Sequence, residues 1–192
     1  GETTKSRKRE LGHQRLKNAL AYLLTIDGIP CIYYGTEQNF LGGPDPSNRE
    51  DMWRSGFERD GLTYRYLKTL IKLRKELPAL RKGDVRFRWS SSLNSSLSSM
   101  AQSQGAGLLA FERSTDEQRV LVVINTNDPS EPEVRAKTQD IEGLGMTVGF
   151  PINSTLVDVL NGSGEDRFTV NSDRKVVIDL PPRSARVLVL AE

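Results

Sequence analysis

Two stretches in the first half of the chain repeat their apolar residues with the spacing of an α-helix. The first stretch begins at Glu10, carries a leucine-rich stripe and ends at Asp27-Gly28. The second begins at Leu62 and ends at Pro78, a residue that cannot continue a helix. The sequence therefore predicts two amphipathic helices, separated by a long connection.

A short apolar run, Ile29 to Tyr34, opens that connection and lies between two glycines. Uninterrupted apolar runs of this length are typical of a strand that is buried on both faces. We therefore predict a buried strand, with Tyr33 and Tyr34 mainly in the core. Cys31, the single cysteine, lies inside this run, so we expect a packed thiol and not a reactive one.

The residues that follow the run are rich in glycine and proline, which excludes regular structure up to about Trp53. Acidic, amide and guanidinium groups share this loop with an indole. Loops with such side chains, held on a rigid scaffold, often carry binding sites. Polar groups around an aromatic ring suit a sugar ligand.

The pattern changes to short strands from Leu80 onward, and turn residues separate one strand from the next. Many short strands without helices predict an antiparallel sandwich. The serine-rich stretch Ser90 to Gln104 is too long for a tight hairpin, so we expect a surface excursion or a partly disordered stretch, with a glycosylated linker as the remoter alternative. The predicted strands are Val85–Trp89, Gly107–Phe111, Val120–Ile124, Leu156–Leu160, Phe168–Val170, Val176–Leu180 and Ala185–Leu190.

Composition adds few constraints. The chain has 192 residues and a net charge of +2, which gives no reason to expect a nucleic-acid partner. No stretch approaches the roughly 18 consecutive apolar residues of a membrane span, so no membrane partner is expected either. The first residues lack the apolar core of a signal peptide, and the sequence leaves a secreted or periplasmic location open.

Two adjacent motifs resemble the alpha-amylase family of glycoside hydrolases. Gly28-Ile-Pro-Cys-Ile-Tyr-Tyr-Gly-Thr-Glu-Gln38 is similar to the last barrel strand of the family and the turn after it. Gly42-Gly-Pro-Asp-Pro-Ser-Asn-Arg-Glu50 is similar to the Asp-Pro-x-Asn-Arg loop of starch-cleaving members. Later segments, such as Leu108-Leu-Ala-Phe-Glu-Arg113, resemble the sandwich that follows the barrel in these enzymes.

The resemblance implies a fold with two parts. Residues 1–79 would be the C-terminal segment of a catalytic (β/α)8 TIM barrel, an α/β fold whose active site lies at the ends of its strands. Residues 80–192 would form an all-β, antiparallel Greek-key sandwich, the domain C of the family. A single barrel strand has no neighbours within this chain, so the remainder of the catalytic barrel is an expected partner. Removal of the rest of a longer enzyme by truncation or proteolysis, a second chain, or repacking within a truncated domain are the three explanations that we consider, and we favour the first.

The same resemblance implies that the catalytic residues lie elsewhere. Retaining cleavage of a glycosidic bond needs two carboxyl groups about 5 Å apart, and the family carries them on earlier barrel strands. We assign no catalytic residue to this chain. Glu37 and Asp45 are a weak substitute pair, because Glu37 and Gln38 support the loop in the family. His13 lacks the Asn-His-Asp setting of the substrate-binding histidine of the family, so we expect a surface or capping position.

Asp45 and Arg49 are the better candidates for sugar binding. In the family, the matching Asp and Arg hold a glucose unit on the non-reducing side of the cut. A carboxylate accepts hydrogen bonds from vicinal hydroxyls, and a guanidinium donates in a rigid fork. A simple ion pair that shapes the loop is the alternative. Trp53 could stack on a sugar ring, although packing of the indole against the barrel is the favoured interpretation.

We therefore expect the C-terminal portion of an alpha-amylase-type enzyme that cleaves alpha-1,4-glucans, such as starch and maltooligosaccharides, with retention. The substrate-binding residues would be Asp45, Arg49 and Trp53, and the chain alone would be inactive. A transglycosylase of the same family is one alternative, and a non-catalytic sugar-binding or interaction module is another. No cofactor or metal site is assigned to this chain, since the calcium ion common in the family has its ligands outside this region.

Overall fold

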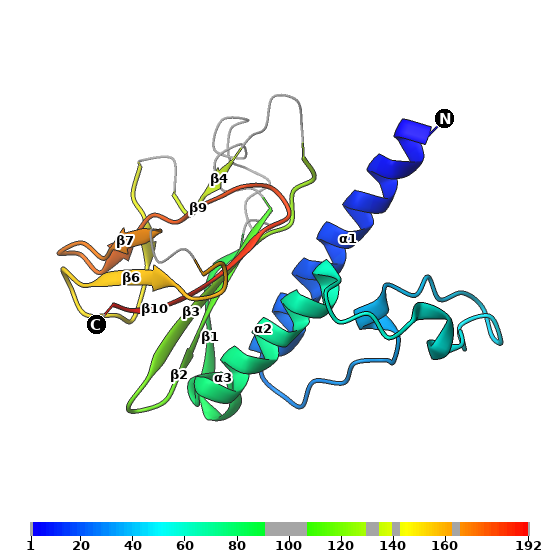
Figure 1. The fold of residues 1–192 in the computed structure, drawn as a ribbon. Coiled ribbons are helices and arrows are strands. Elements are labelled where there is room, and N and C mark those ends of the chain that lie inside the picture. The colour runs from blue at the N-terminus through cyan, green and yellow to red at the C-terminus, as the bar shows by residue number, and fades with distance from the viewer. Residues whose placement is uncertain (1, 91–106, 130–134, 140–142, 163–165, 192) are drawn as a thin grey trace.

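Two long helices lead the fold in a computed structural model that describes residues 2–90, 107–129, 135–139, 143–162 and 166–191 (Figure 1). Helix α1 spans Glu2–Thr25 and α2 spans Leu62–Glu76, so the first helix begins earlier than its apolar stripe predicted. Pro78 precedes a short third helix, α3, at Ala79–Lys82. Two 3-10 helices, η1 at Thr36–Gln38 and η2 at Met52–Ser55, interrupt the connection between α1 and α2.

A six-stranded sheet follows the helices, in the order β1-β2-β3-β10-β6-β7. Every described strand pair is antiparallel, and β10 returns from the end of the chain to lie between β3 and β6. Two small sheets pair β4 with β9 and β5 with β8. The strands are β1 Asp84–Ser90, β2 Leu108–Ser114, β3 Arg119–Asn125, β4 Ala136–Lys137, β5 Met146–Thr147, β6 Thr155–Asp158, β7 Arg167–Thr169, β8 Lys175–Val176, β9 Asp179–Leu180 and β10 Ala185–Leu190.

The antiparallel all-β part was thus predicted correctly, and each predicted strand has a counterpart. The predicted strand Val176–Leu180 is two short strands, β8 and β9, which pair with different partners. Ser90 is the last residue of β1. The rest of the serine-rich stretch falls in residues 91–106, outside the described residues.

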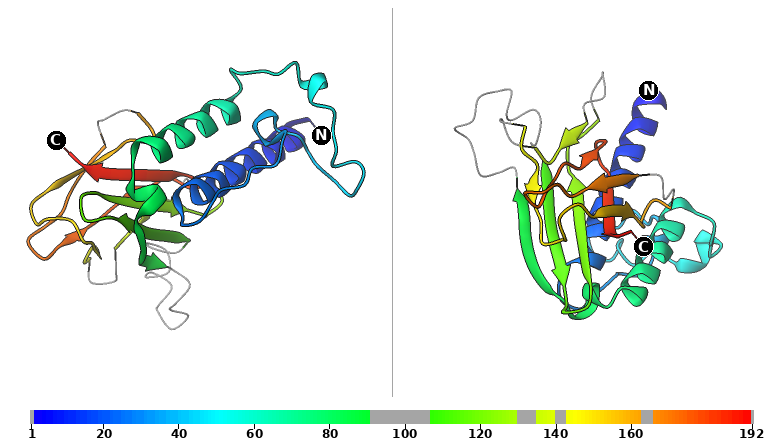
Figure 2. Two further views of the ribbon diagram at one scale, coloured as in Figure 1. Left: turned by 90° about the horizontal axis from the view of Figure 1, so that it is seen from below. Right: turned by 90° about the vertical axis from the view of Figure 1, so that its left-hand side faces the viewer.

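The six-stranded sheet is the middle layer of the molecule, with the helices on one side and the small sheets on the other (Figure 2). Val120, Val122 and Ile124 of β3 belong to the core beneath the helices. Leu121 and Val123 belong to the core beneath the small sheets. Because successive side chains of a strand point to opposite faces, a strand between two covered faces is apolar at every position.

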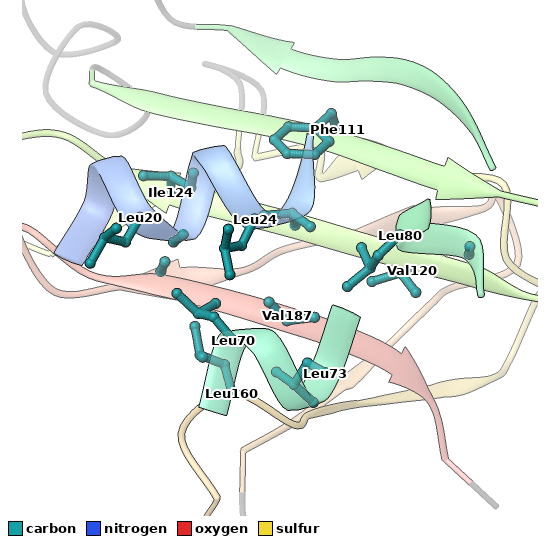
Figure 3. Close-up of a cluster of buried hydrophobic side chains, with 14 of the residues drawn as sticks. Leu20, Leu24, Leu70, Leu73, Leu80, Phe111, Val120, Ile124, Leu160 and Val187 are labelled. Carbon is teal, nitrogen blue, oxygen red and sulfur yellow. The ribbon is translucent and has the colours of Figure 1, made fainter. Parts of the chain in front are cut away.

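The core on the helix side joins the two predicted parts of the chain. Leu24 of α1 and Leu70 of α2 are each only 1% exposed and pack with residues of the sheet (Figure 3). Phe111 and Val187, from β2 and β10, are fully buried in the same cluster. The boundary at residues 79 and 80 stays a prediction, but hydrophobic contact across it is extensive.

The predicted buried strand Ile29–Tyr34 is wrong for this chain. No described strand pairs with these residues, which follow α1 as an extended and largely exposed segment. Ile29 is 98% exposed, Tyr33 and Tyr34 are also exposed, and Cys31 is an exposed free thiol instead of a packed one. The prediction deduced burial from apolar composition, whereas burial also requires neighbouring strands, and the described chain supplies none here.

A buried carboxylate fixes β2 within the sheet. Glu112 is 0% exposed, and its Oε2 accepts hydrogen bonds from Arg88 at 2.6 Å and Arg119 at 2.8 Å. Its other oxygen accepts from the Gly149 backbone N–H at 2.6 Å. A buried charge is tolerated only with such partners. These bonds therefore hold β1, β3 and the backbone at Gly149 against β2.

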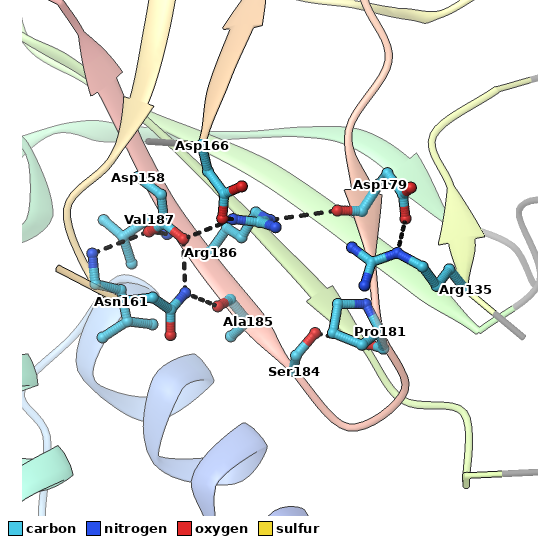
Figure 4. A network of polar contacts seen from close by, with 11 residues as sticks. Arg135, Asp158, Asn161, Asp166, Asp179, Pro181, Ser184, Ala185, Arg186 and Val187 are labelled. Atoms are coloured by element: carbon cyan, nitrogen blue, oxygen red, sulfur yellow. Dashed lines mark hydrogen bonds and ion pairs between the residues drawn. The ribbon is translucent and has the colours of Figure 1, made fainter. Parts of the chain in front are cut away.

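A second polar network surrounds Arg186 of β10 (Figure 4). Its guanidinium donates to Asp158 at 3.0 Å, to Asp166, and to the backbone carbonyl of Asp179 at 3.3 Å. Asp158 also accepts from Asn161 at 2.6 Å. Arg186 lets the carboxylates of Asp158 and Asp166 lie close together, whereas the carboxylate of Asp179 pairs with Arg135 at 2.7 Å. In the described parts of the chain, no group of three or more His, Cys, Asp or Glu side chains is placed to hold a metal ion.

Helix α1 is long, but it is not apolar enough for a lipid bilayer. Within the described residues, no helix meets the length and hydropathy needed to cross a membrane.

Candidate substrate-binding loop

The connection between α1 and α2 contains every predicted site residue. We call residues 35–61 the substrate loop. The loop begins where Gly35 turns with a φ of +84°, and a Cβ at this position would meet the Phe40 ring at 2.1 Å. Only glycine allows this turn to close over the aromatic ring. Phe40 is half-buried and packs edge-on against Tyr34, with ring centroids 6.3 Å apart.

The structure brings Asp45 and Arg49 together. Arg49 Nη2 lies 3.2 Å from Asp45 Oδ1, and the two side chains are 70% and 66% exposed. The peptide bond between Asp45 and Pro46 is cis. Backbone hydrogen bonds from Ser47 to Pro44 at 2.8 Å and from Arg49 to Pro46 at 3.0 Å close the turn between the two charged groups.

Such an exposed ion pair contributes little stability, about 0–1 kcal/mol. The pair therefore does not account for the shape of the loop by itself, and the backbone hydrogen bonds of the turn do more. Both charged groups are open to solvent, with hydrogen-bonding capacity left for a ligand. The arrangement is compatible with sugar binding and with the ion-pair alternative.

Trp53 lies in η2 with 67% of its surface exposed. The guanidinium of Arg54 lies 5.3 Å from the ring centre, and Arg54 also pairs with Asp51 at 3.1 Å. The indole is not buried by the described chain, so its packing against the barrel, the favoured interpretation, stays a prediction. An exposed ring remains free to pack against a neighbouring barrel segment or to stack on a sugar.

Glu37 and Gln38 form η1, and Gln38 has the supporting contact that we expected. Its amide Nε2 donates to the backbone carbonyl of Glu58 at 2.8 Å, across the loop. Asn39 accepts a hydrogen bond of 2.5 Å from Thr63 at the start of α2. These bonds connect the beginning of the substrate loop to its end.

Several hollows border the loop, and one of about 700 Å³ lies between Phe40 and His13 of α1. A cavity of about 430 Å³ is bordered by Arg49, Asp51 and Arg54 together with Phe40 and Pro46. A smaller cavity of about 290 Å³ lies between the two tyrosines and Asn48. The side-chain oxygen of Asn48 is buried and has no hydrogen-bond partner among the described residues.

The sequence analysis missed two residues of this site, Phe40 and Asn48. Asn48 lies inside the resembling motif, so its place in the loop was visible, but not its buried oxygen. Phe40 carried no signal beyond being an aromatic residue after a glycine-rich turn. His13 lies within α1 and is half-buried, which agrees with a surface position and excludes a capping role.

In the hollow between the two tyrosines, the pKa of Tyr34 is raised above its usual value. Partial desolvation raises the pKa of this phenol, and the neighbouring Tyr33 adds to the effect. Tyr34 therefore stays protonated at neutral pH and can donate or accept a hydrogen bond. Acid chemistry at this position is not indicated.

Comparison with known proteins relates the chain to alpha-amylases and cyclomaltodextrin glucanotransferases. Residues 100–191 match the family model of the alpha amylase, C-terminal all-beta domain. Alpha-amylase 2 of Schwanniomyces occidentalis is 36% identical over 112 residues, which cover 57% of this chain and 20% of that protein. Cyclomaltodextrin glucanotransferase of Paenibacillus macerans is 34% identical over 146 residues, which cover 76% of this chain and 17% of that protein.

Solved structures agree with these relatives. The alpha-amylase from Anoxybacillus superimposes with a TM-score of 0.69 at 28% identity, over 93% of this chain and 32% of that one. The alpha-amylase from Geobacillus thermoleovorans, solved with acarbose, gives a TM-score of 0.68 at 27% identity, over 93% of this chain and 33% of that one. The chain spans about a fifth of the length of the first curated relatives and about a third of these structures.

The family model covers residues 100–191, and the two alpha-amylase structures superimpose on 93% of the chain. The chain therefore belongs to the alpha-amylase family, where it corresponds to the C-terminal part of the enzymes and contains their all-beta C-terminal domain.

Proposed function

We propose that this chain is the C-terminal portion of a retaining glycoside hydrolase that cleaves alpha-1,4-glucans such as starch. In this proposal, α1, the segment 29–34 and α2 are the end of a (β/α)8 barrel, and the six-stranded sheet with its small sheets is the domain behind it. The catalytic carboxylates lie in the remainder of the barrel. The relatives named alpha-amylase support this assignment.

The exposed apolar side chains between the two helices are the observation that carries the proposal. Ile29, Leu41 and Leu62 are 98%, 87% and 70% exposed, and Trp53 and Phe57 are also largely exposed. Large apolar side chains that are this exposed, gathered in one segment of the chain, favour a surface that another part of a protein covers. In a barrel the neighbouring strands would cover it, because parallel strands are buried on both faces.

Asp45 and Arg49 are proposed to hold a glucose unit on the non-reducing side of the cleavage site. The Asp45 carboxylate accepts from two hydroxyls of the sugar, and Arg49 donates to an adjacent oxygen. Trp53 provides an apolar surface beside them. Because the proposal places the catalytic acids outside this chain, Asp45 and Arg49 orient the substrate and take no part in proton transfer.

An assay of reducing-sugar release from starch tests the hydrolase assignment. The isolated 192-residue chain is expected to give no turnover, and the complete enzyme that contains it is expected to give turnover with retention at the anomeric carbon. Turnover by the isolated chain would contradict the placement of the catalytic acids. Inversion in the complete enzyme would contradict the retaining mechanism.

A transglycosylase is the second candidate, and the similarity to the cyclomaltodextrin glucanotransferase of Paenibacillus macerans supports it. Product analysis separates the two reactions. Linear maltooligosaccharides indicate hydrolysis, whereas cyclic products or products longer than the substrate indicate transfer. Sugar binding without any turnover in the complete protein would instead identify a non-catalytic module.

A further inference from the structure

Two arginines hold the C-terminal end of α1. Arg74 of α2 donates to the backbone carbonyls of Leu24 at 2.9 Å, Ile26 at 3.3 Å and Gly28 at 2.6 Å. Arg113 of β2 donates to the carbonyl of Thr25 at 2.9 Å. The last carbonyls of a helix lack partners within the helix and form its negative end, so guanidinium groups are well suited to this place.

Arg113 connects this end to the sheet. Its side chain is 0% exposed, and it also donates to the carbonyl of Gly83 at 2.7 Å. Asp27, in the turn after α1, lies 3.4 Å from its Nη2. The turn from α1 into the substrate segment, residues 29–61, is therefore fixed to a strand of the central sheet.

Arg74 connects the two ends of the substrate segment. The chain leaves α1 at the residues that Arg74 holds, and it returns through α2, the helix that carries Arg74. Gly28 has a φ of +98°, which sets the direction of exit from the turn, and its carbonyl receives the shortest of the Arg74 bonds. One guanidinium thus fixes the exit of the segment relative to its return.

The beginning of the substrate segment makes few contacts with the rest of the described chain. Ile29 is 98% exposed and Cys31 is exposed, although Ile32 packs in part against the core on the helix side. A hydrogen bond to α2 comes further along, where Asn39 accepts from Thr63. The direction in which residues 29–31 leave the helix therefore depends on the turn at residues 24–28.

We propose that Arg74 and Arg113 form a positioning clamp. The clamp fixes the direction in which the substrate segment leaves α1, and it thereby places the substrate loop, residues 35–61. The clamp residues touch no substrate, and they act through the backbone that they hold. The effect on sugar binding rests on the proposed function, whereas the mechanical effect on residues 29–34 does not.

The single cysteine of the chain provides the test. A nitroxide attached to the exposed Cys31 lies three residues after Gly28 and reports its motion by electron paramagnetic resonance. Arg74→Lys keeps the charge but removes the planar fork that reaches several carbonyls at once. The label is expected to rotate several-fold faster in Arg74→Lys than in the parent chain, well below the unfolding midpoint.

Arg65→Lys is the matched control, because Arg65 is exposed on the same helix. It is expected to leave the spectrum unchanged. An unchanged spectrum in Arg74→Lys would overturn the clamp, even if the unfolding midpoint fell, since a merely stabilising arginine would lower the midpoint alone. Arg113 is not the primary target, because loss of a buried arginine can prevent folding.

A second measurement separates the clamp from the proposed function. In the complete enzyme, Arg74→Lys is expected to lower kcat/KM for a long maltooligosaccharide several-fold, and Arg65→Lys is not. Faster label motion with unchanged kcat/KM would overturn the role of the clamp in placing the sugar-binding loop. Faster label motion in an enzyme without activity on any alpha-glucan would support the clamp and contradict the proposed function instead.

Discussion

Truncation of Leu24 tests whether the helices and the sheet form one cooperative unit. Leu24 of α1 is 1% exposed and belongs to a cluster with residues of α2, β3 and β10. Leu24→Ala removes three buried carbon atoms from this shared core. Because the surrounding layers are fixed by the sheet, the cavity can close only in part, and the expected loss is about 3 kcal/mol of unfolding free energy.

The loss should affect the whole molecule. If α1 packed on an independent domain, its destabilisation would unfold the helices and leave the sheet intact. In the structure, Phe111 and Val187 bury their side chains in the same cluster as Leu24. We therefore expect helices and sheet to unfold in one transition, in the parent chain and in the variant.

Urea unfolding followed by two signals measures this. Far-ultraviolet circular dichroism reports the helices, and fluorescence of Trp89, which packs against the core between the sheets, reports the sheet. A Trp53→Phe background leaves Trp89 as the only indole, since the chain has two tryptophans. Leu62→Ala, at a position that is 70% exposed, is the control and should change stability by less than about 0.5 kcal/mol. Loss of the helical signal at a urea concentration where Trp89 is still native would refute the reasoning.

Three further predictions concern the polar and backbone contacts. Glu112→Gln leaves the part-buried Arg88 and Arg119 without their counter-charge and should cost about 3 kcal/mol in urea unfolding, the low end of the range because Arg119 is one-third exposed. Glu117→Gln, at an exposed turn, is the control, and equal effects would contradict the network. Hydrogen bonds from Arg15 and Arg183 lower the pKa of the Asp128 carboxyl. The stability difference between the parent and Asp128→Asn should therefore be present at neutral pH and vanish as the pH falls through the folded pKa, below about 3.9. A stability difference that grows in acid would disprove this. Gly83→Ala would place a Cβ 2.6 Å from the backbone carbonyl oxygen of Ala79 and should lower the unfolding free energy by about 1–3 kcal/mol in thermal melting. Gly12→Ala in α1 has open space and should raise the unfolding free energy by about 0.5–1 kcal/mol. An unchanged stability of Gly83→Ala would show that the backbone relaxes.

Local pattern predicted most of the sheet and both long helices, because in those elements the neighbours that bury each residue lie within the chain. The run Val120–Ile124 is a strand with two covered faces, as its uninterrupted apolar sequence indicated. The same rule fails for Ile29–Tyr34. The two runs look alike in sequence, but only the first has strands on either side, and no local pattern records the presence of neighbours.

The three-layer arrangement was also beyond local pattern. The helices were assigned to one domain and the strands to another, whereas Leu24 and Leu70 pack on the same face of the sheet as Val122. An amphipathic stripe states that a helix has an apolar face, but not which surface covers it. In the site, the motif located Asp45 and Arg49, and the structure shows them in contact.

Sugar recognition by Asp45 and Arg49 is the central claim, and substrate length provides its most direct measurement. Steady-state kcat/KM of the complete enzyme is measured with maltooligosaccharides of increasing length, for the parent, Asp45→Ala and Arg49→Ala. Glu76→Ala removes an exposed ion pair on α2, outside the loop, and is the control. Loss of a charged hydrogen bond predicts a fall of about tenfold to hundredfold for substrates long enough to reach the loop, and no change for shorter ones. A fall that is equal at every length, or no fall in either variant, would contradict the assignment of these residues to a glucose-binding position.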